Sequence, residues 1–256
     1  MFADNQALRD AVDLWLDDKL QAMLDYGHVS DWNVLAVTDM SFLFYETDFC
    51  DDVSQWDVSS VVTMKAMFQD APQFQSDVSH WQVTRVTDFS HMFHGATLFD
   101  GDVSTWDVGY SYSSDHGNLR RSESESMALA AINMESMFES ATAFDGDLTL
   151  WETGTVVNMQ SMFRNAVTFD CNLRHWDTAA VDTMRDMFRG AKKFSQQLCW
   201  KIRDDADTVD MMEGSQGRVL TGSGCTIGTA PTSAKGVVTV LDSIGANMWA
   251  MAFTSF

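Results

Sequence analysis

The feature that most constrains this chain is a tryptophan that returns at an almost fixed interval. Trp56, Trp81 and Trp106 are spaced by 25 residues, and Trp151 and Trp176 repeat that spacing. The interval from Trp106 to Trp151 is 45 residues, which is one period plus 20 inserted residues. A row of phenylalanines keeps the same period: Phe49, Phe74, Phe99, Phe144, Phe169 and Phe194. A fixed period between about 20 and 50 residues is typical of solenoids, in which each repeat packs on its neighbours.

The repeat at 52–76 predicts the local structure of all the others. Its W-x-V alternation, at Trp56 and Val58, predicts a short strand with both side chains facing inward. Four apolar residues follow at i, i+3, i+4 and i+7, which predicts one face of a two-turn helix. These residues are Met64, Met67, Phe68 and Ala71. A threonine directly before them, Thr63, predicts the helix N-cap. The quartet recurs in the other repeats. A less regular copy, with two of the four positions polar, lies at 208–215.

These patterns predict an α/β protein, a right-handed solenoid of about seven 25-residue strand–turn–helix modules whose strands pair in parallel. Residues 6–25 place apolar side chains at helical spacing, so we expect a capping helix within 1–28. The repeat solenoid is expected over 29–215, followed by a C-terminal cap and tail over 216–256. Within the solenoid, the Ser-rich segment 109–128 predicts a disordered insertion.

Charge and cysteine content limit the function. The chain has 37 acidic and 16 basic residues and a net charge of −21, which disfavours nucleic acid and anionic membranes and favours cations or basic partners. The apolar stretch 237–253 is interrupted by polar residues and is short for a membrane span, so we expect no membrane insertion. The cysteines lack metal-type spacing and leave the disulfide pairing open, with Cys199 and Cys225 as candidates in an oxidising compartment; they are Cys50, Cys171, Cys199 and Cys225.

The candidate site is the exposed face of the predicted strands. Outward positions vary between repeats while inward positions do not, and the exposed sheet of a solenoid is its usual recognition surface. The predicted partner-binding residues are Asp31, Gln55, Asp57, His80, Gln82, Thr105, Asp107, Glu152, His175 and Asp177. Their acidity predicts a protein or a surface glycan with basic character. The alternative is that these side chains are solvated and bind nothing.

No cofactor and no dedicated metal site are predicted. A further acidic row precedes each strand and is explained best by turn capping; it comprises Asp52, Asp77, Asp102, Asp147 and Asn172. Weak calcium binding is the second candidate for the F-D-G-D turns, which carry Asp100 with Asp102 and Asp145 with Asp147. His91 and His94 lie three residues apart and supply two ligands, too few for a closed zinc site.

The repeat D-[VL]-S-x-W-D-[VT]-x-x-V-x-x-M-x-x-M-F-x-x-A-x-x-F resembles the BspA-like surface-protein repeat, also called the mycoplasma lipoprotein-type 25/26-residue repeat. The resemblance covers about 29–215 and is carried in one repeat by Trp56-Asp57-Val58, Val61, Thr63-Met64, Met67-Phe68, Ala71 and Phe74. It implies a leucine-rich-repeat-like fold, although valine occupies the asparagine position of that motif. It also implies a binding or adhesion module at the cell surface or outside the cell. Charged residues soon after Met1 predict no secretory signal in the sequence as written.

Catalysis is not expected. The chain contains no G-x-S-x-G, H-E-x-x-H, P-loop or dinucleotide motif. The remote enzymatic alternative is a polysaccharide-active hydrolase that uses Asp107 and Glu152 as paired carboxylates. The closer alternative is an intracellular scaffold of the same fold. The function predicted from the sequence is therefore a non-catalytic protein-interaction or adhesion module that binds its partner on the acidic exposed face.

Overall fold

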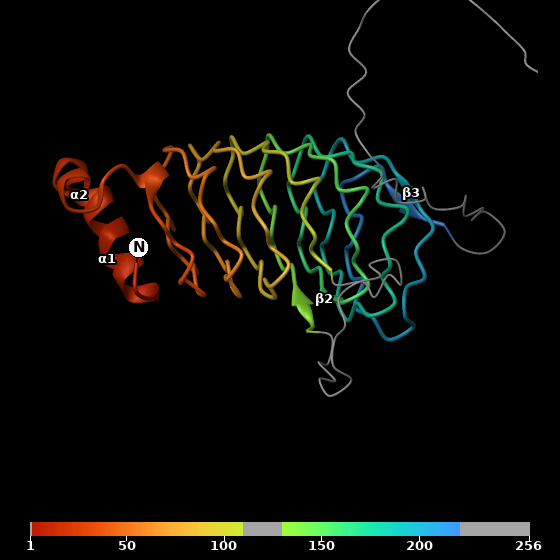
Figure 1. Ribbon diagram of the computed structural model, residues 1–256. Coiled ribbons are helices and arrows are strands. Elements are labelled where there is room, and N and C mark those ends of the chain that lie inside the picture. Colours follow the sequence, from red (N-terminus) through yellow and green to blue (C-terminus); the bar gives the residue numbers. More distant parts are fainter. Residues whose placement is uncertain (1, 110–129, 221–256) are drawn as a thin grey trace, which may run out of the picture. The chain divides into compact units, whose positions relative to one another are not determined.

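The structure, a computed structural model, describes residues 2–109 and 130–220 (Figure 1). It begins with two helices, α1 (Asn5–Asp17) and α2 (Lys19–Tyr26), and a short 3₁₀ turn, η1 (Val29–Asp31). Four short strands follow, and they pair in parallel as β1 with β2 and β3 with β4. Their bounds are β1 Ile132–Asn133, β2 Val156–Asn158, β3 Gln197–Leu198 and β4 Arg218–Val219. The remaining described chain consists of turns and irregular segments.

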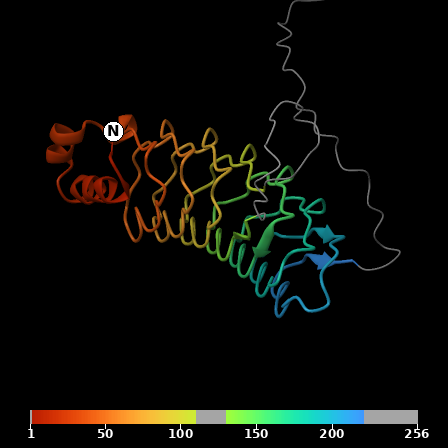
Figure 2. The same ribbon diagram turned by 60° about the horizontal axis from the view of Figure 1, so that its bottom comes forward.

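Successive repeats pack on one another in sequence order, as the ribbon shows from two directions (Figures 1 and 2). The indole rings of Trp151 and Trp176 stack with their centroids 6.2 Å apart and their planes 1° from parallel. Trp106 stacks on Trp151 at 6.4 Å, so the repeats on either side of the insertion are direct neighbours. The phenylalanines form columns of the same kind, with Phe138 and Phe163 5.7 Å apart. The period read from the sequence is thus a period of contact between neighbouring repeats.

The apolar positions of each repeat are buried as expected. In the repeat at 52–76 they are Val53, Trp56, Val58, Val61, Met64, Met67, Phe68, Ala71 and Phe74, none more than 3% exposed. The repeat tryptophans from Trp56 to Trp200 also donate their indole N–H groups to a main-chain carbonyl of the repeat before. Trp106 Nε1, for example, lies 2.9 Å from the carbonyl oxygen of Val78. This bond explains why the position holds tryptophan, which combines a large apolar ring with a donor.

The predicted fold class is wrong. An α/β, right-handed leucine-rich-repeat-like solenoid of about seven strand–turn–helix modules requires one helix and one full strand in every repeat. Within the described residues the helices are α1 and α2, both before the first repeat, and every strand has only two or three residues. The segment 56–58 forms no strand. Parallel bridges lie instead directly before each apolar quartet, at Asp39, Thr63, Asp88, Asn133, Asn158, Thr183 and Asp207.

Hydrogen bonding shows what replaces the predicted helices. Met64 N–H donates to the carbonyl of Asp88 in the next repeat, whereas Met67 N–H donates back to the carbonyl of Met64, three residues earlier. Alternate N–H groups therefore join repeats, and those between them close turns. Two residues per repeat have left-handed backbone, such as Ala66 and Asp70, both with φ of 53°. A run of turns with this alternation has no continuous i→i−4 ladder and is not a helix.

The spacing of the repeats explains why helices are absent. The Phe68 and Phe93 rings, which belong to neighbouring repeats, lie 5.8 Å apart. Packed α-helices need about 8–10 Å between their axes. A helix in each repeat would hold the repeats too far apart for these rings to stack. The predicted N-cap Thr63 accordingly caps no helix; its hydroxyl accepts the N–H of Lys65 at 3.3 Å within a turn.

The N-terminal cap consists of two helices where the sequence predicted one. Asp18 separates them: its N–H ends α1 on the carbonyl of Leu14, and its carboxylate accepts the N–H of Gln21 in the first turn of α2. An aspartate that satisfies an exposed N–H favours a new helix start at that point. Neither helix is long and apolar enough to cross a bilayer.

Polar side chains attach the cap to the first repeat. Arg9 Nη1 donates to the carbonyl of Ser41 at 2.6 Å, and Trp15 Nε1 donates to Asp51 at 2.9 Å. Lys19 Nζ reaches the same carboxylate at 2.7 Å. The cap therefore covers the first repeat with both apolar contacts and charged hydrogen bonds.

The remaining predictions about domain organisation are tested only in part. Of the predicted C-terminal cap and tail, 216–220 is described, and there β4 pairs with β3 of the preceding repeat. The rest of that segment lies outside the described residues, as do Cys225 and nearly all of the predicted disordered insertion 109–128. Cys50 and Cys171 are free thiols.

Candidate functional site

The ten predicted partner-binding residues are all exposed. They lie immediately before and after the buried tryptophan of each repeat, so they form two rows along one face of the stack. We call this surface the acidic face and define it by Asp57, Asp107, Glu152 and Asp177, the acids that follow the tryptophans. Neighbouring tryptophan rings are 6.2–6.5 Å apart along these repeats. Each exposed residue of the rows is a chain neighbour of its tryptophan, so the rows follow the order of the tryptophans along the stack.

A hollow of about 360 Å³ lies on this face between two neighbouring repeats. It is lined by Ser54, Gln55, Trp56, Asp57, Val58, His80 and Gln82. Four of these residues were predicted to bind a partner. The hollow thus brings together predicted residues from both rows, with amide, imidazole and carboxylate groups at its edge.

Turn hydrogen bonds orient the carboxylates of the acidic face. Asp57 Oδ1 accepts the N–H of Ser59 at 3.1 Å, and Asp177 Oδ1 accepts the N–H of Ala179 at 3.0 Å. Each bond uses one carboxylate oxygen. Within the described part of the chain, no basic side chain forms an ion pair with Asp57, Glu152 or Asp177. Turn hydrogen bonds therefore hold Asp57 and Asp177 in fixed positions, and neither forms an ion pair within the described residues.

The row that precedes each tryptophan segment caps turns, which confirms that prediction. Asp52 Oδ1 accepts the N–H of Ser54 at 2.8 Å, and Asp147 Oδ1 accepts the N–H of Thr149 at 2.9 Å. These main-chain hydrogen bonds are the largest cause of the lowered pKa of Asp52, Asp77 and Asp147, since a hydrogen bond to the charged form favours it. Asp52, Asp77 and Asp147 are thus turn caps whose charged form is favoured by the turn.

The F-D-G-D turns use their first carboxylates to join repeats. Asp100 Oδ1 accepts the N–H of Asp145, and Asp145 Oδ1 accepts the N–H of Asp170, each at 2.9 Å. Among the described residues, no three His, Cys, Asp or Glu side chains converge as a metal site. Calcium binding stays a prediction, which a change in melting temperature on adding calcium or a chelator would test.

We expect acid to destabilise the protein through these turn caps. A carboxyl whose pKa is lower in the folded than in the unfolded chain stabilises the fold above its unfolded pKa, about 3.9, and loses that effect as pH falls through the folded pKa. Asn172 holds the same position in another repeat and accepts the N–H of Arg174 at 3.2 Å. Asp77→Asn should therefore keep the turn while reducing the loss of unfolding free energy as the pH falls below about 4. Urea unfolding across this range measures it, and an unchanged pH profile would contradict the assignment.

His91 and His94 lie together at the surface of one repeat. Their Nδ1 atoms are 3.4 Å apart, and His94 Nδ1 lies 3.8 Å from Glu139. Burial of His91 lowers the pKa of its imidazole. Arg164 shares the Glu139 carboxylate at 3.7 Å, so this glutamate has two basic neighbours. The arrangement is a small surface charge cluster.

Asp107 and Glu152, the pair considered for hydrolysis, belong to adjacent repeats. Both side chains are exposed. A glycosidase acid is usually kept protonated by apolar surroundings, which exposed side chains do not provide. The two residues contribute to the acidic face, and the predicted lack of catalysis stays a prediction.

One row of polar residues, at the parallel bridges before the apolar quartets, was not predicted as a set from the sequence. The bridge residues Asp39, Thr63, Asp88, Asn133, Asn158, Thr183 and Asp207 each accept a main-chain N–H two residues ahead. The available signal was their chemistry: each is Asp, Asn or Thr, and each stands directly before the apolar quartet. Residues of these types bond the main chain two residues on and thereby start a turn. They mark the place where the predicted helix is replaced by turns.

Comparison with known proteins agrees with the repeats. A family model described as "Mycoplasma protein of unknown function, DUF285" matches residues 18–119 and again 117–219. A search of the curated proteins found no match. A search of the solved structures also found none. The two matched segments together span the N-terminal cap from α2 onward and every repeat. The chain therefore belongs to the DUF285 family of repeat proteins.

Proposed function

We propose that this chain is a non-catalytic interaction or adhesion module that binds a basic partner along its acidic face. The resemblance of the repeat to the BspA-like surface-protein repeat implies binding and adhesion, and it supports a surface role. The net charge of −21 supports a partner of opposite sign. On the same resemblance, we place the protein at the cell surface or outside the cell, which surface biotinylation of intact cells would test.

The spacing of the acidic face carries the proposal. Asp107, Glu152 and Asp177 stand in three successive repeats whose tryptophan rings are 6.4 and 6.2 Å apart. An extended peptide advances about 3.2–3.4 Å per residue, so side chains on one of its edges recur every 6.4–6.8 Å. A segment with Lys or Arg at every second residue would place one cation opposite each carboxylate. The matching partner is thus an extended protein segment with alternating basic residues.

The strength of this contact comes from repetition. A single exposed ion pair contributes only about 0.2–1 kcal/mol. Several pairs in register add their effects once the first has formed, because the later contacts become intramolecular. Exposed charges are screened over about 8 Å at physiological ionic strength, so binding should weaken steeply as salt rises. Such multivalent, salt-sensitive attachment suits adhesion.

Charge reversal on the acidic face tests the proposal. We expect Asp107→Lys, Glu152→Lys and Asp177→Lys together to weaken binding of a peptide with lysine at every second position by about tenfold or more. The matched control reverses Asp13, Asp17 and Asp48, which are exposed acids outside the face, and changes net charge equally. Its affinity should stay within about twofold of the parent protein.

Fluorescence anisotropy at low and moderate salt provides both affinities. A second peptide of the same composition, with its lysines in one block, checks register and should bind less tightly to the parent protein. Equal losses in the two triple variants would show that net charge, not the acidic face, attracts the peptide. Equal binding of the two peptides would remove the argument from spacing.

A further inference from the structure

Exposed apolar side chains gather at the N-terminal end of the protein. Leu20 and Leu24 of α2 are 75% and 81% exposed, and they share one face because they lie four residues apart. Leu16, Met23 and Tyr26 are exposed nearby in the sequence, while Ala22 is the one buried residue of α2. Exposed leucines on one face of a regular helix usually mark a contact surface. This apolar face of α2 has no partner in the described chain.

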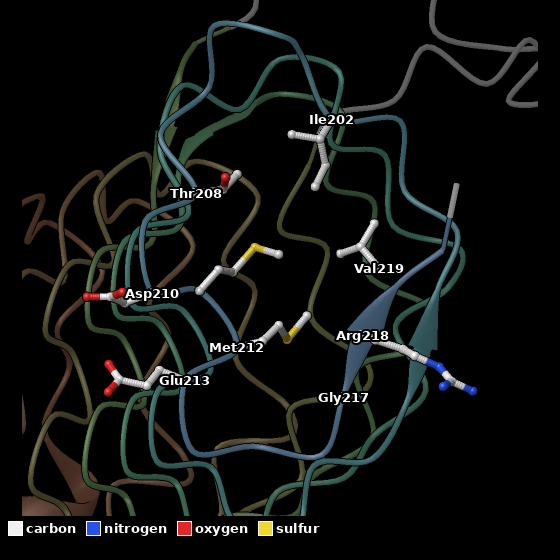
Figure 3. A pocket seen from close by; sticks show the side chains of 9 residues that line it. Ile202, Thr208, Asp210, Met212, Glu213, Gly217, Arg218 and Val219 are labelled. Atoms are coloured by element: carbon white, nitrogen blue, oxygen red, sulfur yellow. The ribbon is translucent and has the colours of Figure 1, made fainter. Parts of the chain in front are cut away.

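At the opposite end of the stack, no further repeat covers the last one among the described residues. A hollow of about 430 Å³ lies on the last repeat, lined by Ile202, Thr208, Asp210, Met211, Met212, Glu213, Gly217, Arg218 and Val219. Figure 3 shows the side chains of Ile202, Met212 and Val219 directed into it. The charged side chains of Glu213 and Arg218 point away from its centre, on opposite sides (Figure 3). The hollow is thus apolar inside and charged at its edge, and its methionines adapt readily to a partner's shape.

Main-chain donors are also left open at this end. In each earlier repeat, alternate N–H groups donate to carbonyls of the next repeat, as Gly190 N–H does to Glu213 at 2.7 Å. The last repeat has no successor among the described residues. The matching N–H groups there, which lack an acceptor within 2–109 and 130–220, belong to Thr208, Asp210, Met212 and Gly214. A row of free donors favours a partner that brings acceptor oxygens.

The two ends of the stack differ in net charge, and this difference restricts which ends of two molecules can come into contact. Residues 1–50 contain ten acids and two bases, whereas 181–220 contain seven of each. Two N-terminal ends brought together would repel each other. An acidic N-terminal end brought to a neutral C-terminal end avoids that repulsion and offers carboxylates to the free N–H groups.

We propose that the protein self-associates head to tail, with the Leu20 and Leu24 face of α2 in one molecule seated in the C-terminal hollow of the next. This association uses the two ends of the stack and leaves the acidic face open, so it goes beyond the proposed function. Direct stacking of a first repeat on a last repeat is blocked, because Arg9 already occupies the carbonyls of Asp39 and Ser41. The contact joins two different surfaces and therefore continues into linear assemblies.

Sedimentation velocity of the full chain over a range of concentrations tests the inference. The parent protein should show a mass that rises with concentration. Leu24→Asp and, separately, Met212→Asp should each weaken association about 100-fold, the effect of losing one buried leucine-sized contact with an added charge. Leu150→Asp, at a 66% exposed leucine in the middle of the stack, is the matched control and should not change it. Circular dichroism and melting temperature confirm that each variant is folded.

Mixing the two variants identifies the geometry. Each keeps one working end, so an equimolar mixture of the Leu24→Asp and Met212→Asp proteins should form a dimer and nothing larger. A parent protein that stays monomeric at every concentration would overturn the proposal. So would a mixture that fails to dimerise, or a single variant that still dimerises with itself, because the latter result indicates contact between like ends. Association that appears only after residues 221–256 are removed would also overturn it, since the chain's own C-terminal segment would then cover the hollow.

Discussion

Replacing Trp106 with alanine is expected to lower the free energy of unfolding by about 3–5 kcal/mol, at the upper end of single-residue effects. The side chain is 2% exposed and stacks on Trp81 and Trp151 at 6.5 and 6.4 Å. Its indole N–H also satisfies the buried carbonyl of Val78. Losing this one ring leaves a cavity where three successive repeats meet. Urea unfolding followed by circular dichroism measures the change.

Two further variants separate the contributions of Trp106. Trp106→Phe keeps an aromatic ring in the column but leaves the carbonyl of Val78 without its donor, which should cost about 1–3 kcal/mol. Leu150→Ala removes an exposed leucine from the same stack and should change stability by less than about 0.5 kcal/mol. A Trp106→Ala effect as small as that of Leu150→Ala would mean that the aromatic columns do not hold the repeats together.

Replacing Gly95 with alanine is expected to destabilise the protein next most strongly. Gly95 has a φ of 69°, and an alanine in this left-handed region costs about 1–2 kcal/mol more than glycine. An added Cβ would also collide with the Asp70 carboxylate of the preceding repeat. The total loss should therefore be larger than the backbone cost alone, because the Asp70 side chain must also move away from the new Cβ. Thermal and urea unfolding of the single variant give this value.

A double-mutant cycle isolates the collision. In the Asp70→Gly background, Gly95→Ala should lower the free energy of unfolding only by the cost of backbone strain, about 1–2 kcal/mol. Ser140→Gly is the control for backbone strain, because Ser140 holds the equivalent position in the next repeat with a φ of 59°. That substitution should change stability by no more than about 1 kcal/mol, since relief of strain offsets the flexibility of glycine. Equal costs of Gly95→Ala in both backgrounds would refute the contact with Asp70.

The candidate site was predictable as a set of residues but not as a surface. Asp57 was predicted to face outward because it stands between buried Trp56 and Val58, and the structure confirms its exposure. The hollow beside it forms only where His80 and Gln82 of the next repeat close its other side. The match between the acidic face and an extended basic segment also depended on the distance between the tryptophan rings of neighbouring repeats. A sequence gives the period in residues, not in ångströms.

The sequence by itself determined the period, the buried set and the turn caps. A fixed period requires every repeat to bury the same positions, so the residues equivalent to Trp56 and Phe68 had to face the core. Short-range chemistry was equally readable, since Asp52 caps its own turn wherever that turn lies.

Only the tertiary structure decided what the chain does between Thr63 and Phe74. Apolar residues at i, i+3, i+4 and i+7 suit a helix, yet they suit a run of turns with two left-handed residues equally well. The choice depends on the neighbouring repeats. Rings that stack less than 6 Å apart, such as Phe68 on Phe93, leave no room for helices, and alternate N–H groups bond to the next repeat instead. No window of sequence contains that constraint, because it comes from a contact between residues 25 positions apart.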